Sequence, residues 1–286
     1  MTELDYNTID LIIKNALLED IGEGDHSSLA CVPKEATGKA QLLVKEPGII
    51  AGVTLAQRII ALYDPNLEVE VLIKDGSQVQ IGDVVLIVSG SSRSILATER
   101  LLLNFMQRMS GIATLSRKYA DLVAHTSCKI LDTRKTTPNI RYMEKWAVRI
   151  GGALNHRFAL YDMIMIKDNH IDYAGGIQQA IFATRNYLAK TNKNLKVEIE
   201  VRDFDELKQV LEVGQVDRIM LDNFTPDQIK EALALIPTHF ETEASGGITE
   251  ETLVAYAETG VNFISVGALT HSFKSLDLSL KAVFEQ

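Results

Sequence analysis

The sequence has little of what marks secreted, metal-bound or disordered chains. Its 286 residues include only two cysteines, Cys31 and Cys128, without the spacing of a zinc site or a disulfide framework. We expect both to be ordinary thiols, most simply buried in a core. There are six prolines, no low-complexity tract and 23% charged residues, so a disordered chain is excluded.

Long hydrophobic runs and an excess of positive charge are also missing. No apolar run approaches the ~20 residues that a membrane-spanning helix needs. The N-terminal stretch, MTELDYNTID, is acidic and polar, unlike a signal peptide. The formal net charge of -9 disfavours nonspecific nucleic-acid binding, which requires a broad basic surface. We therefore expect a cytoplasmic globular protein of one large or two medium domains.

Against this acidic background, one stretch is locally basic. Between Thr133 and His170 there are seven Lys and Arg and three acidic residues, a local charge of +4. A solvated surface is the ordinary explanation of such a cluster. Here, however, the basic residues adjoin strand-like runs (KILDTRK, MIMIKD) and do not repeat on one helical face, so the pattern favours a pocket for a multiply anionic small molecule. The donors are Arg134, Lys135, Arg141, Lys145, Arg149, Arg157 and Lys167, with His156 and His170.

The first third of the chain mixes helical and strand-like patterns. Residues 8–20 have helical periodicity, and short strand-like runs follow up to residue 90. The stretch DGSQVQIGDVV has the turn chemistry of an antiparallel hairpin. Residues 93–124 read as one or two long helices, with Gly111 as the expected break or bend. Arg100 lies on the polar side of this run, where an exposed helix face is the simplest interpretation.

From Lys129 onward, strand-like and helical segments alternate. The apolar runs end at polar or glycine residues that are 33, 33, 22, 23 and 22 residues apart, about the length of one helix plus one strand. This spacing predicts an α/β barrel, in which functional residues lie at the C-terminal ends of the strands. The strand-end residues are Arg134, Lys167, Glu200, Asp222, Ser245 and Gly267.

Two late strand ends have the features of a phosphate site. Ser245-Gly246-Gly247 precedes a predicted helix, and Gly267-Ala268 follows the next strand. The loops after the last two strands of α/β barrels often bind phosphate through backbone N–H groups.

Between the basic stretch and these loops lie two carboxylates, Glu200 and Asp222. They can accept hydrogen bonds from sugar hydroxyls or hold Mg2+. If they have only a structural role, we expect them to form salt bridges to Lys167 or Arg134. Glu198 is the alternative to Glu200 on the same strand.

Taken together, the motifs resemble those of the quinolinate phosphoribosyltransferase family. DTRKTTP, EKWAVRIGG, NHR and IKDNHI occur in the family's order and spacing, and the similarity extends from EDIGEGD to EASGGI and SVGALTHS. The resemblance implies an incomplete, TIM-like α/β barrel with an N-terminal, hammerhead-like α/β sandwich. It implies domains at 1–112 and 113–270, followed at 271–286 by a C-terminal helix that packs back on the N-terminal domain.

The resemblance also implies a reaction. Quinolinate and 5-phosphoribosyl-1-pyrophosphate, with Mg2+, would give nicotinate mononucleotide, pyrophosphate and CO2 in de novo NAD synthesis. The family forms homodimers with shared active sites, which implies that Arg100 reaches the partner's site.

Residue roles follow from the same resemblance. Lys135, Lys167, Glu200 and Asp222 would be the catalytic residues. The carboxylates of quinolinate would be held by Arg134, His156, Arg157 and Lys167, with Thr133 alongside. The pyrophosphate would lie near Lys135 and Lys167, and the ribose hydroxyls and Mg2+ would be held by Glu200 and Asp222. The 5-phosphate would be bound by Ser245, Gly246, Gly247, Val266, Gly267 and Ala268.

Three other interpretations are open. A paralogue of this family associated with molybdenum transport shares the fold and some motifs, although the complete set TRK, NHR and IKDNH favours the biosynthetic enzyme. A Schiff-base aldolase would use Lys167 as its nucleophile. A noncatalytic ligand sensor would bind without turnover.

Overall fold

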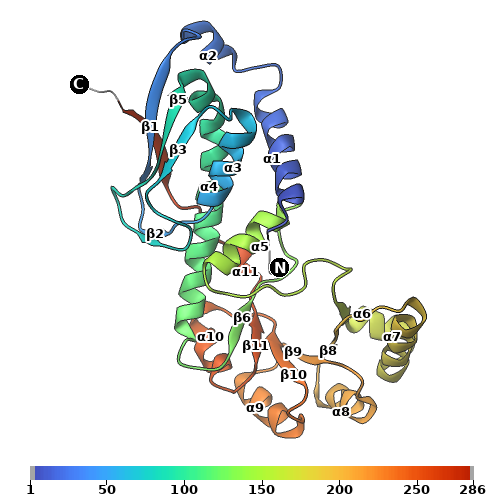
Figure 1. Ribbon diagram of the computed structural model, residues 1–286. Helices are drawn as coiled ribbons and strands as arrows, with labels where there is room; N and C mark the ends of the chain where they lie inside the picture. Colours follow the sequence, from blue (N-terminus) through green and yellow to red (C-terminus); the bar gives the residue numbers. More distant parts are fainter. Residues whose placement is uncertain (1–3, 284–286) are drawn as a thin grey trace. The chain divides into compact units, whose positions relative to one another are not determined.

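The computed structural model describes residues 4–283, which divide into two compact units (Figure 1). The first contains the residues up to Arg117, then Lys135–Gly152, and then the residues from Ala268 onward. The second contains Lys118–Arg134 and Ala153–Gly267. The predicted boundary after residue 112 is near the first transition, but the return of 135–152 to the first unit was not predicted.

The first unit is built on an antiparallel sheet of four strands in the order β12-β1-β5-β3, with a separate two-stranded sheet β2-β4. The strands are β1 (Thr37–Val44), β2 (Gly48–Ile49), β3 (Glu68–Val71), β4 (Gln78–Val79), β5 (Val84–Ser91) and β12 (Leu278–Val283). The helices are α1 (Tyr6–Ile21), α2 (His26–Cys31), α3 (Val53–Tyr63), α4 (Ser92–Leu122), α5 (Arg141–Ile150) and α11 (Ala268–His271).

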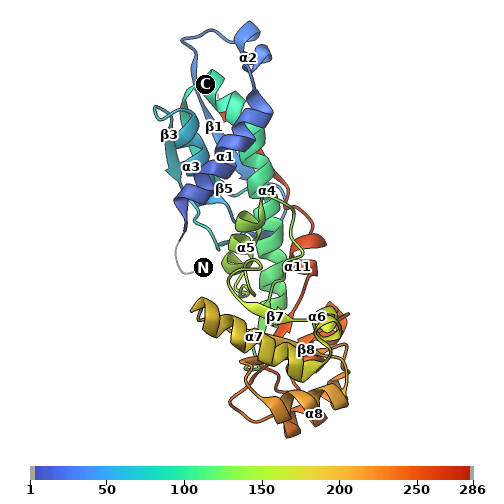
Figure 2. The same cartoon turned by 90° about the vertical axis from the view of Figure 1, so that its right-hand side faces the viewer.

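Alternation along β1 explains how this unit forms its core. Ala40, Leu42 and Val44 are buried, whereas the residues between them are more exposed, as expected of a strand with one face against the core. Apolar residues of α3 and α4 pack on the same face, and Figures 1 and 2 show both helices beside the sheet. The result is an α/β sandwich, as the family resemblance implied.

Two local predictions in this unit are wrong. The DGSQVQIGDVV stretch does not form a hairpin, because β4 pairs with β2 and β5 pairs with β1 and β3. The segment after Ser272 contains the strand β12, paired antiparallel with β1, and not a helix up to Val283. Its sequence LDLSL alternates, and Leu276, Leu278 and Leu280 are buried on one face, which is the strand period of two.

Helix α4 is continuous from Ser92 to Leu122 and does not break at Gly111. This glycine has a packing function instead. A Cβ atom at Gly111 would overlap the carbonyl oxygen of Lys274, so only glycine permits this close approach of two backbones.

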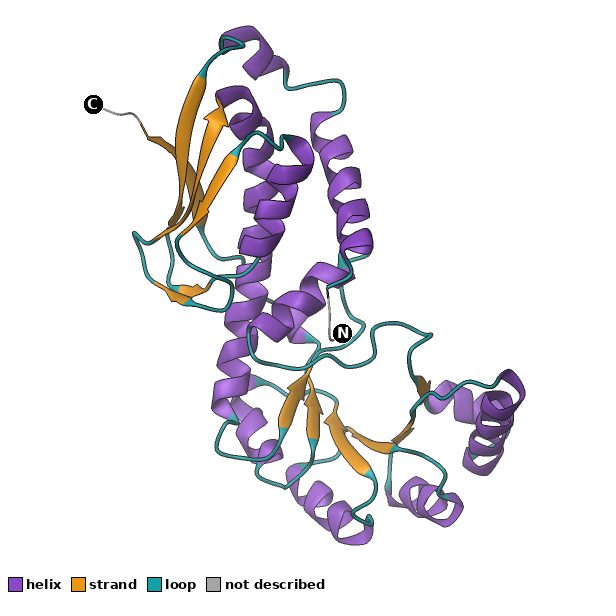
Figure 3. Cartoon of the chain, viewed as in Figure 1, coloured by secondary structure: helices purple, strands orange, loops and turns teal. Residues whose placement is uncertain are grey.

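The second unit is a curved parallel sheet of six strands in the order β6-β11-β10-β9-β8-β7 (Figure 3). The first strand pairs with the last, and the sheet is open between β6 and β7, which confirms the predicted incomplete α/β barrel. The strands are β6 (Lys129–Leu131), β7 (Ile164–Ile166), β8 (Val197–Val201), β9 (Arg218–Asp222), β10 (Glu241–Ser245) and β11 (Phe263–Ser265).

Helices connect successive strands and lie outside this sheet (Figure 1). They are α6 (Asp168–Ala174), α7 (Ile177–Thr191), α8 (Phe204–Val213), α9 (Pro226–Leu235) and α10 (Glu250–Ala257). Two of them have side-chain N-caps: Asp203 accepts hydrogen bonds at the start of α8 and Thr225 at the start of α9. Of all the helices described, none is both long enough and apolar enough to cross a bilayer.

Candidate functional site

The C-terminal ends of the six parallel strands bring most of the predicted site residues to one edge of the sheet. Arg134 follows β6, Lys167 follows β7, and Glu200 and Asp222 lie at the ends of β8 and β9. The candidate phosphate loops continue this edge with Ser245, Gly246 and Gly247 after β10, and Val266 and Gly267 after β11. By contrast, Lys135, Ala268 and Arg100 belong to the first unit.

Arg134 and Arg157 form the cationic part of this edge. Burial lowers the pKa of the half-buried Arg157 guanidinium, and the nearby charge of Arg134 lowers it further. A second guanidinium close enough to disfavour the charge on Arg157 creates a strong local demand for an anion. The Arg157 Nη1 atom also lies 3.4 Å from the carbonyl oxygen of Met163, to which it donates.

Lys167 pairs with Glu200 across neighbouring strands. Its Nζ donates to Glu200 Oε2. This is the salt bridge that was expected if Glu200 has a structural role. The Glu200 side chain is almost fully buried, whereas that of Lys167 is 42% exposed. His170 is directed at the start of α6, where its Nδ1 accepts the Lys167 N–H at 2.9 Å and so caps that helix.

The loop after β10 is shaped by close packing against the end of β9. Gly246 has φ +97°, and a Cβ atom there would overlap Oδ1 of Asn223. The Asn223 N–H donates to the Ser245 carbonyl at 2.8 Å, and its amide nitrogen donates to Asp222 at 2.6 Å. Glycine therefore allows the loop to lie against the neighbouring strand end, where its backbone is available to a ligand.

The segment that carries Arg157 is attached to the end of β6. Leu154 forms a parallel bridge with Leu131. The buried Asp132 side chain accepts from the Asn155 amide at 2.7 Å and from the His156 N–H at 2.8 Å. Asp132 thus fixes the NHR segment beside the half-buried Thr133.

Beneath this edge, the barrel interior contains a buried charged cluster of His156, Glu198, Glu243 and Arg218. His156 Nε2 lies 2.9 Å from Glu198 Oε2 and 3.3 Å from Glu243 Oε2. Arg218 Nη1 donates to Glu243 Oε2 at 2.9 Å. Both glutamates have no exposed surface, and because buried charges are stable only when paired, the four groups act as a unit.

The protonation of this cluster is shared between its members. Burial lowers the pKa of His156, but its contacts with Glu198 and Glu243 outweigh burial and raise it to about 9. Burial and the charge of Glu243 raise the pKa of Glu198 to about 7. For Glu243, burial acts upward, but His156 and Arg218 outweigh it and lower the pKa. The Arg157 N–H opposes the rise in the pKa of His156: His156 Nδ1 accepts it at 2.7 Å and cannot do so while protonated, so in this arrangement the ring has one proton, on Nε2, facing the carboxylates.

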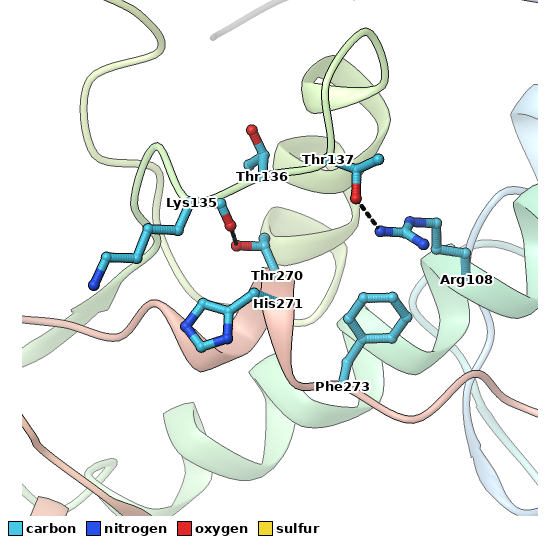
Figure 4. A pocket seen from close by; sticks show the side chains of 7 residues that line it. All are labelled: Arg108, Lys135, Thr136, Thr137, Thr270, His271 and Phe273. Atoms are coloured by element: carbon cyan, nitrogen blue, oxygen red, sulfur yellow. Dashed lines mark hydrogen bonds between the residues drawn. The ribbon is translucent and has the colours of Figure 1, made fainter.

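A cavity in the first unit contains Lys135 and other hydrogen-bonding side chains (Figure 4). Its volume is about 590 Å³. Thr270 Oγ1 donates to the Lys135 carbonyl at 2.8 Å, which holds the start of the KTT segment. The cavity is lined by Arg108, Lys135, Thr136, Thr137, Thr270, His271 and Phe273.

Arg108 is held in place by Glu144, which is fully buried on α5. The guanidinium Nε donates to Glu144 at 2.9 Å, and the group lies 4.8 Å from the centre of the Phe273 ring. Arg108 is therefore not part of a plain solvated helix face. Arg100, on the same helix, is exposed.

Sequence reasoning missed several residues of the site. It did not select Asp132, Arg218 or Glu243, and it treated Glu198 as a substitute for Glu200. Glu198 and Glu200 are two residues apart on β8, so they point to the same side of the strand, and both are buried. Charged residues at alternate positions within apolar strands, as in VEIEV and ETEAS, were the available signal.

These features define an α/β-barrel protein with cationic side chains gathered at the C-terminal edge of its sheet. The model for the quinolinate phosphoribosyltransferase C-terminal domain matches residues 112–281, and that for the N-terminal domain matches residues 25–110. The chain belongs to the quinolinate phosphoribosyltransferase family.

Individual relatives agree with this assignment over nearly the whole chain. The chloroplastic nicotinate-nucleotide pyrophosphorylase (carboxylating) of Arabidopsis thaliana is 49% identical, over 96% of this chain and 84% of the relative. A probable nicotinate-nucleotide pyrophosphorylase (carboxylating) of Bacillus subtilis is 42% identical, over 94% and 91%. Among solved structures, NadC from Streptococcus pyogenes superposes with a TM-score of 0.93, at 40% identity over 100% of both chains.

Proposed function

We propose that this protein is a pentosyltransferase that transfers the phosphoribosyl group of 5-phosphoribosyl-1-pyrophosphate to quinolinate. The products are nicotinate mononucleotide, pyrophosphate and CO2, in de novo NAD synthesis. The observation that carries the proposal is the proximity of Arg134, which follows β6, and Arg157, on the scaffold of a family whose members are named for this reaction.

The substrate's two carboxylates match this arrangement. Arg134, Arg157 and Lys167 bind them, because guanidinium forks and an ammonium group satisfy two adjacent anions. Thr133 adds a hydroxyl beside Arg134. His156 was predicted to bind a carboxylate as well, but its side chain is only 5% exposed and both ring nitrogens lie against protein atoms.

Lys135 and Lys167 lie near the pyrophosphate in this proposal, and Glu200 and Asp222 hold the ribose hydroxyls. Ser245, Gly246, Gly247, Val266, Gly267 and Ala268 bind the 5-phosphate through backbone N–H groups.

The chemistry then needs little beyond placement and charge. The pyridine nitrogen forms a bond to the anomeric carbon as the bond to pyrophosphate breaks, and positive charge develops on the sugar. Glu200 and Asp222 stabilise that charge, while the lysines stabilise the leaving group. The quaternary nitrogen then stabilises the carbanion left when the adjacent carboxylate departs as CO2, and a solvent proton replaces it.

Mg2+ fits the carboxylates at this edge, because it prefers oxygen ligands and substrate phosphates. Glu200 and Asp222 would hold it, and it would neutralise charge on the pyrophosphate. Two carboxylates, one of them paired with Lys167, are too few for a closed protein cage, so we infer that the ion enters with the substrate.

We also propose a homodimer in which Arg100 completes the partner's site. The exposure of Arg100 on α4 and the family resemblance support it. The cytoplasm, expected from the composition, is the proposed location. Cell fractionation tests it, because some plant relatives are named chloroplastic or mitochondrial.

The deciding experiment supplies both substrates with Mg2+ and measures pyrophosphate and CO2 together. Equal amounts of the two products are expected with quinolinate, and far less turnover with nicotinate, which lacks the second carboxylate. Failure of a folded, Mg2+-supplied protein to release either product would reject the proposal.

One alternative is separated by a specific contact. A Schiff-base aldolase needs Lys167 as a free nucleophile, but the Lys167 side chain is engaged in an ion pair with Glu200. Borohydride trapping with a carbonyl substrate should therefore leave Lys167 unmodified. The related paralogue would release no CO2 from quinolinate, and a sensor would bind without turnover.

A further inference from the structure

The buried cluster of His156, Glu198, Glu243 and Arg218 has no place in the reaction as described above. Its groups come from β8, β9, β10 and the segment between α5 and β7, four separate parts of the second unit. Burying several charges is unfavourable unless they are paired, so a cluster of this kind is unexpected in a merely structural core.

The orientation of the imidazole ring shows what the cluster is connected to. Nε2 faces inward, 2.9 Å and 3.3 Å from the two carboxylates. Nδ1 faces the backbone and accepts the N–H of Arg157 at 2.7 Å. The two carboxylates face Nε2 and the Arg157 N–H faces Nδ1, so neither ring nitrogen is directed at a ligand outside the barrel.

The backbone from Asn155 to Arg157 is therefore held by three successive contacts. Asp132 accepts from the Asn155 side chain and from the His156 N–H, and the His156 ring accepts from the Arg157 N–H. The last contact depends on the ring orientation, which the glutamates set. A carboxylate that fixes the tautomer and plane of an imidazole is a recurring device in proteins.

A metal ion is a poorer explanation of the same residues. His156, Glu198 and Glu243 could supply three ligand atoms within 4.8 Å of one another. However, Arg218 already places a positive charge at 2.9 Å from Glu243, and a second cation beside it would be repelled.

We propose that His156, Glu198 and Glu243 are positioning residues that fix the backbone of Arg157, and through it the guanidinium that receives a substrate carboxylate. The inference rests on the proposed function, because it takes quinolinate as the ligand of Arg157. It assigns His156 an indirect role in place of direct contact with the substrate.

Two substitutions at His156 separate the indirect role from direct contact. An asparagine places its side-chain oxygen near the position of Nδ1 and can still accept the Arg157 N–H, whereas a glutamine places its amide near Nε2 and cannot. The quinolinate Kd, measured by calorimetry, should rise about threefold in His156→Asn and tenfold or more in His156→Gln, since one hydrogen bond corresponds to roughly a factor of ten. His125→Asn, at an exposed histidine paired with Glu258, is the matched control and should not change the Kd.

A double-mutant cycle tests the route through Arg157. In an Arg157→Ala background, His156→Gln should change the quinolinate Kd by less than twofold, because the guanidinium it positions is gone. Glu198→Gln should raise the quinolinate Kd severalfold while leaving the KM for the phosphoribosyl donor within twofold, and this effect should also vanish with Arg157→Ala. This variant provides the test if the His156 variants do not fold.

The outcomes are distinguishable. If the wild-type protein binds no quinolinate, the proposed function fails. If it binds quinolinate but His156→Asn and His156→Gln lose equal affinity, or the loss persists without Arg157, His156 contacts the substrate directly and the inference is overturned. One equivalent of metal in the purified protein that is lost in Glu243→Gln would also overturn it.

Discussion

The interiors of the two units have different chemistry. The sheet core of the first unit is formed by aliphatic residues and methionine from β1, β5, β12, α3 and α4. The barrel of the second unit contains Glu198, Arg218 and Glu243 within its strands, all buried. Apolar burial stabilises a fold at about 25 cal/mol per Å², whereas buried charges add little net stability but hold polar groups in place. The sheet core of the first unit is thus stabilised by apolar burial, whereas the barrel strands use buried charges to hold polar groups in place, as Glu144 of α5 does for Arg108 in the first unit.

The largest expected effect tests the first unit. Leu86 is fully buried in β5, so Leu86→Ala should lower the free energy of unfolding by about 3 kcal/mol, a typical value for this change in a core. The KM for quinolinate should not change. Urea unfolding measures the loss, with Leu18→Ala at an exposed position as the control. A stability loss no greater than that of Leu18→Ala would show that this core is not close-packed.

The second expected effect tests the strand-end site. Arg134→Ala should weaken quinolinate binding roughly 100-fold, because it removes a charge-assisted, bidentate contact. The melting temperature should remain within a degree or two, since Arg134 is exposed. Calorimetric titration measures the affinity, and Arg185→Ala, which removes a surface ion pair with Asp217, is the control. Unchanged affinity would mean that the anchoring residue lies elsewhere.

The third prediction tests whether both units contribute to catalysis across a dimer. Inactive Arg100→Ala subunits and inactive Lys167→Ala subunits should together recover about a quarter of wild-type activity, because half of randomly mixed dimers contain one intact site of two. Subunit exchange is confirmed by native mass spectrometry. Exchange without recovery would indicate that each chain forms a complete site alone.

The smallest effect concerns pH. The pKa of the Glu198 carboxyl is raised to about 7 by burial and by the charge of Glu243, so above its ordinary value this carboxyl keeps a proton in the folded protein that it has lost in the unfolded chain. The stability that comes from this proton is therefore fully present below the ordinary carboxyl value of 4.5 and is lost as the pH rises through 7. Unfolding at pH 6.5 and 8.5 should show lower stability at 8.5, and Glu198→Gln should reduce the difference. Higher wild-type stability at pH 8.5 would contradict this assignment.

The sequence allowed the barrel strands to be predicted because each is an apolar run that ends in a polar or glycine residue. Arg134, Lys167 and Asp222 were found for this reason. The segment 271–286 was expected to be helical by analogy, although LDLSL has the period of a strand. The pairing of β4 with β2 depends on contacts distant in sequence, which the turn residues between β4 and β5 do not encode.

The inward cluster could not be assembled from the sequence for a related reason. Glu198, Arg218 and Glu243 lie on three different strands, and their contacts depend on the register of β8, β9 and β10. The orientation of the His156 ring depends on all of them. Propensity and periodicity describe single elements, whereas these interactions arise only when the sheet is formed.

The chain passes between the two units four times, after Arg117, Arg134, Gly152 and Gly267. Neither unit is therefore encoded by one uninterrupted stretch of the gene. Cutting at a single junction cannot release the barrel, and exchanging it with that of another family member would require several simultaneous splices. Arg134 and Lys135, neighbours in the chain, stand on either side of one such passage, so the two units must be inherited together.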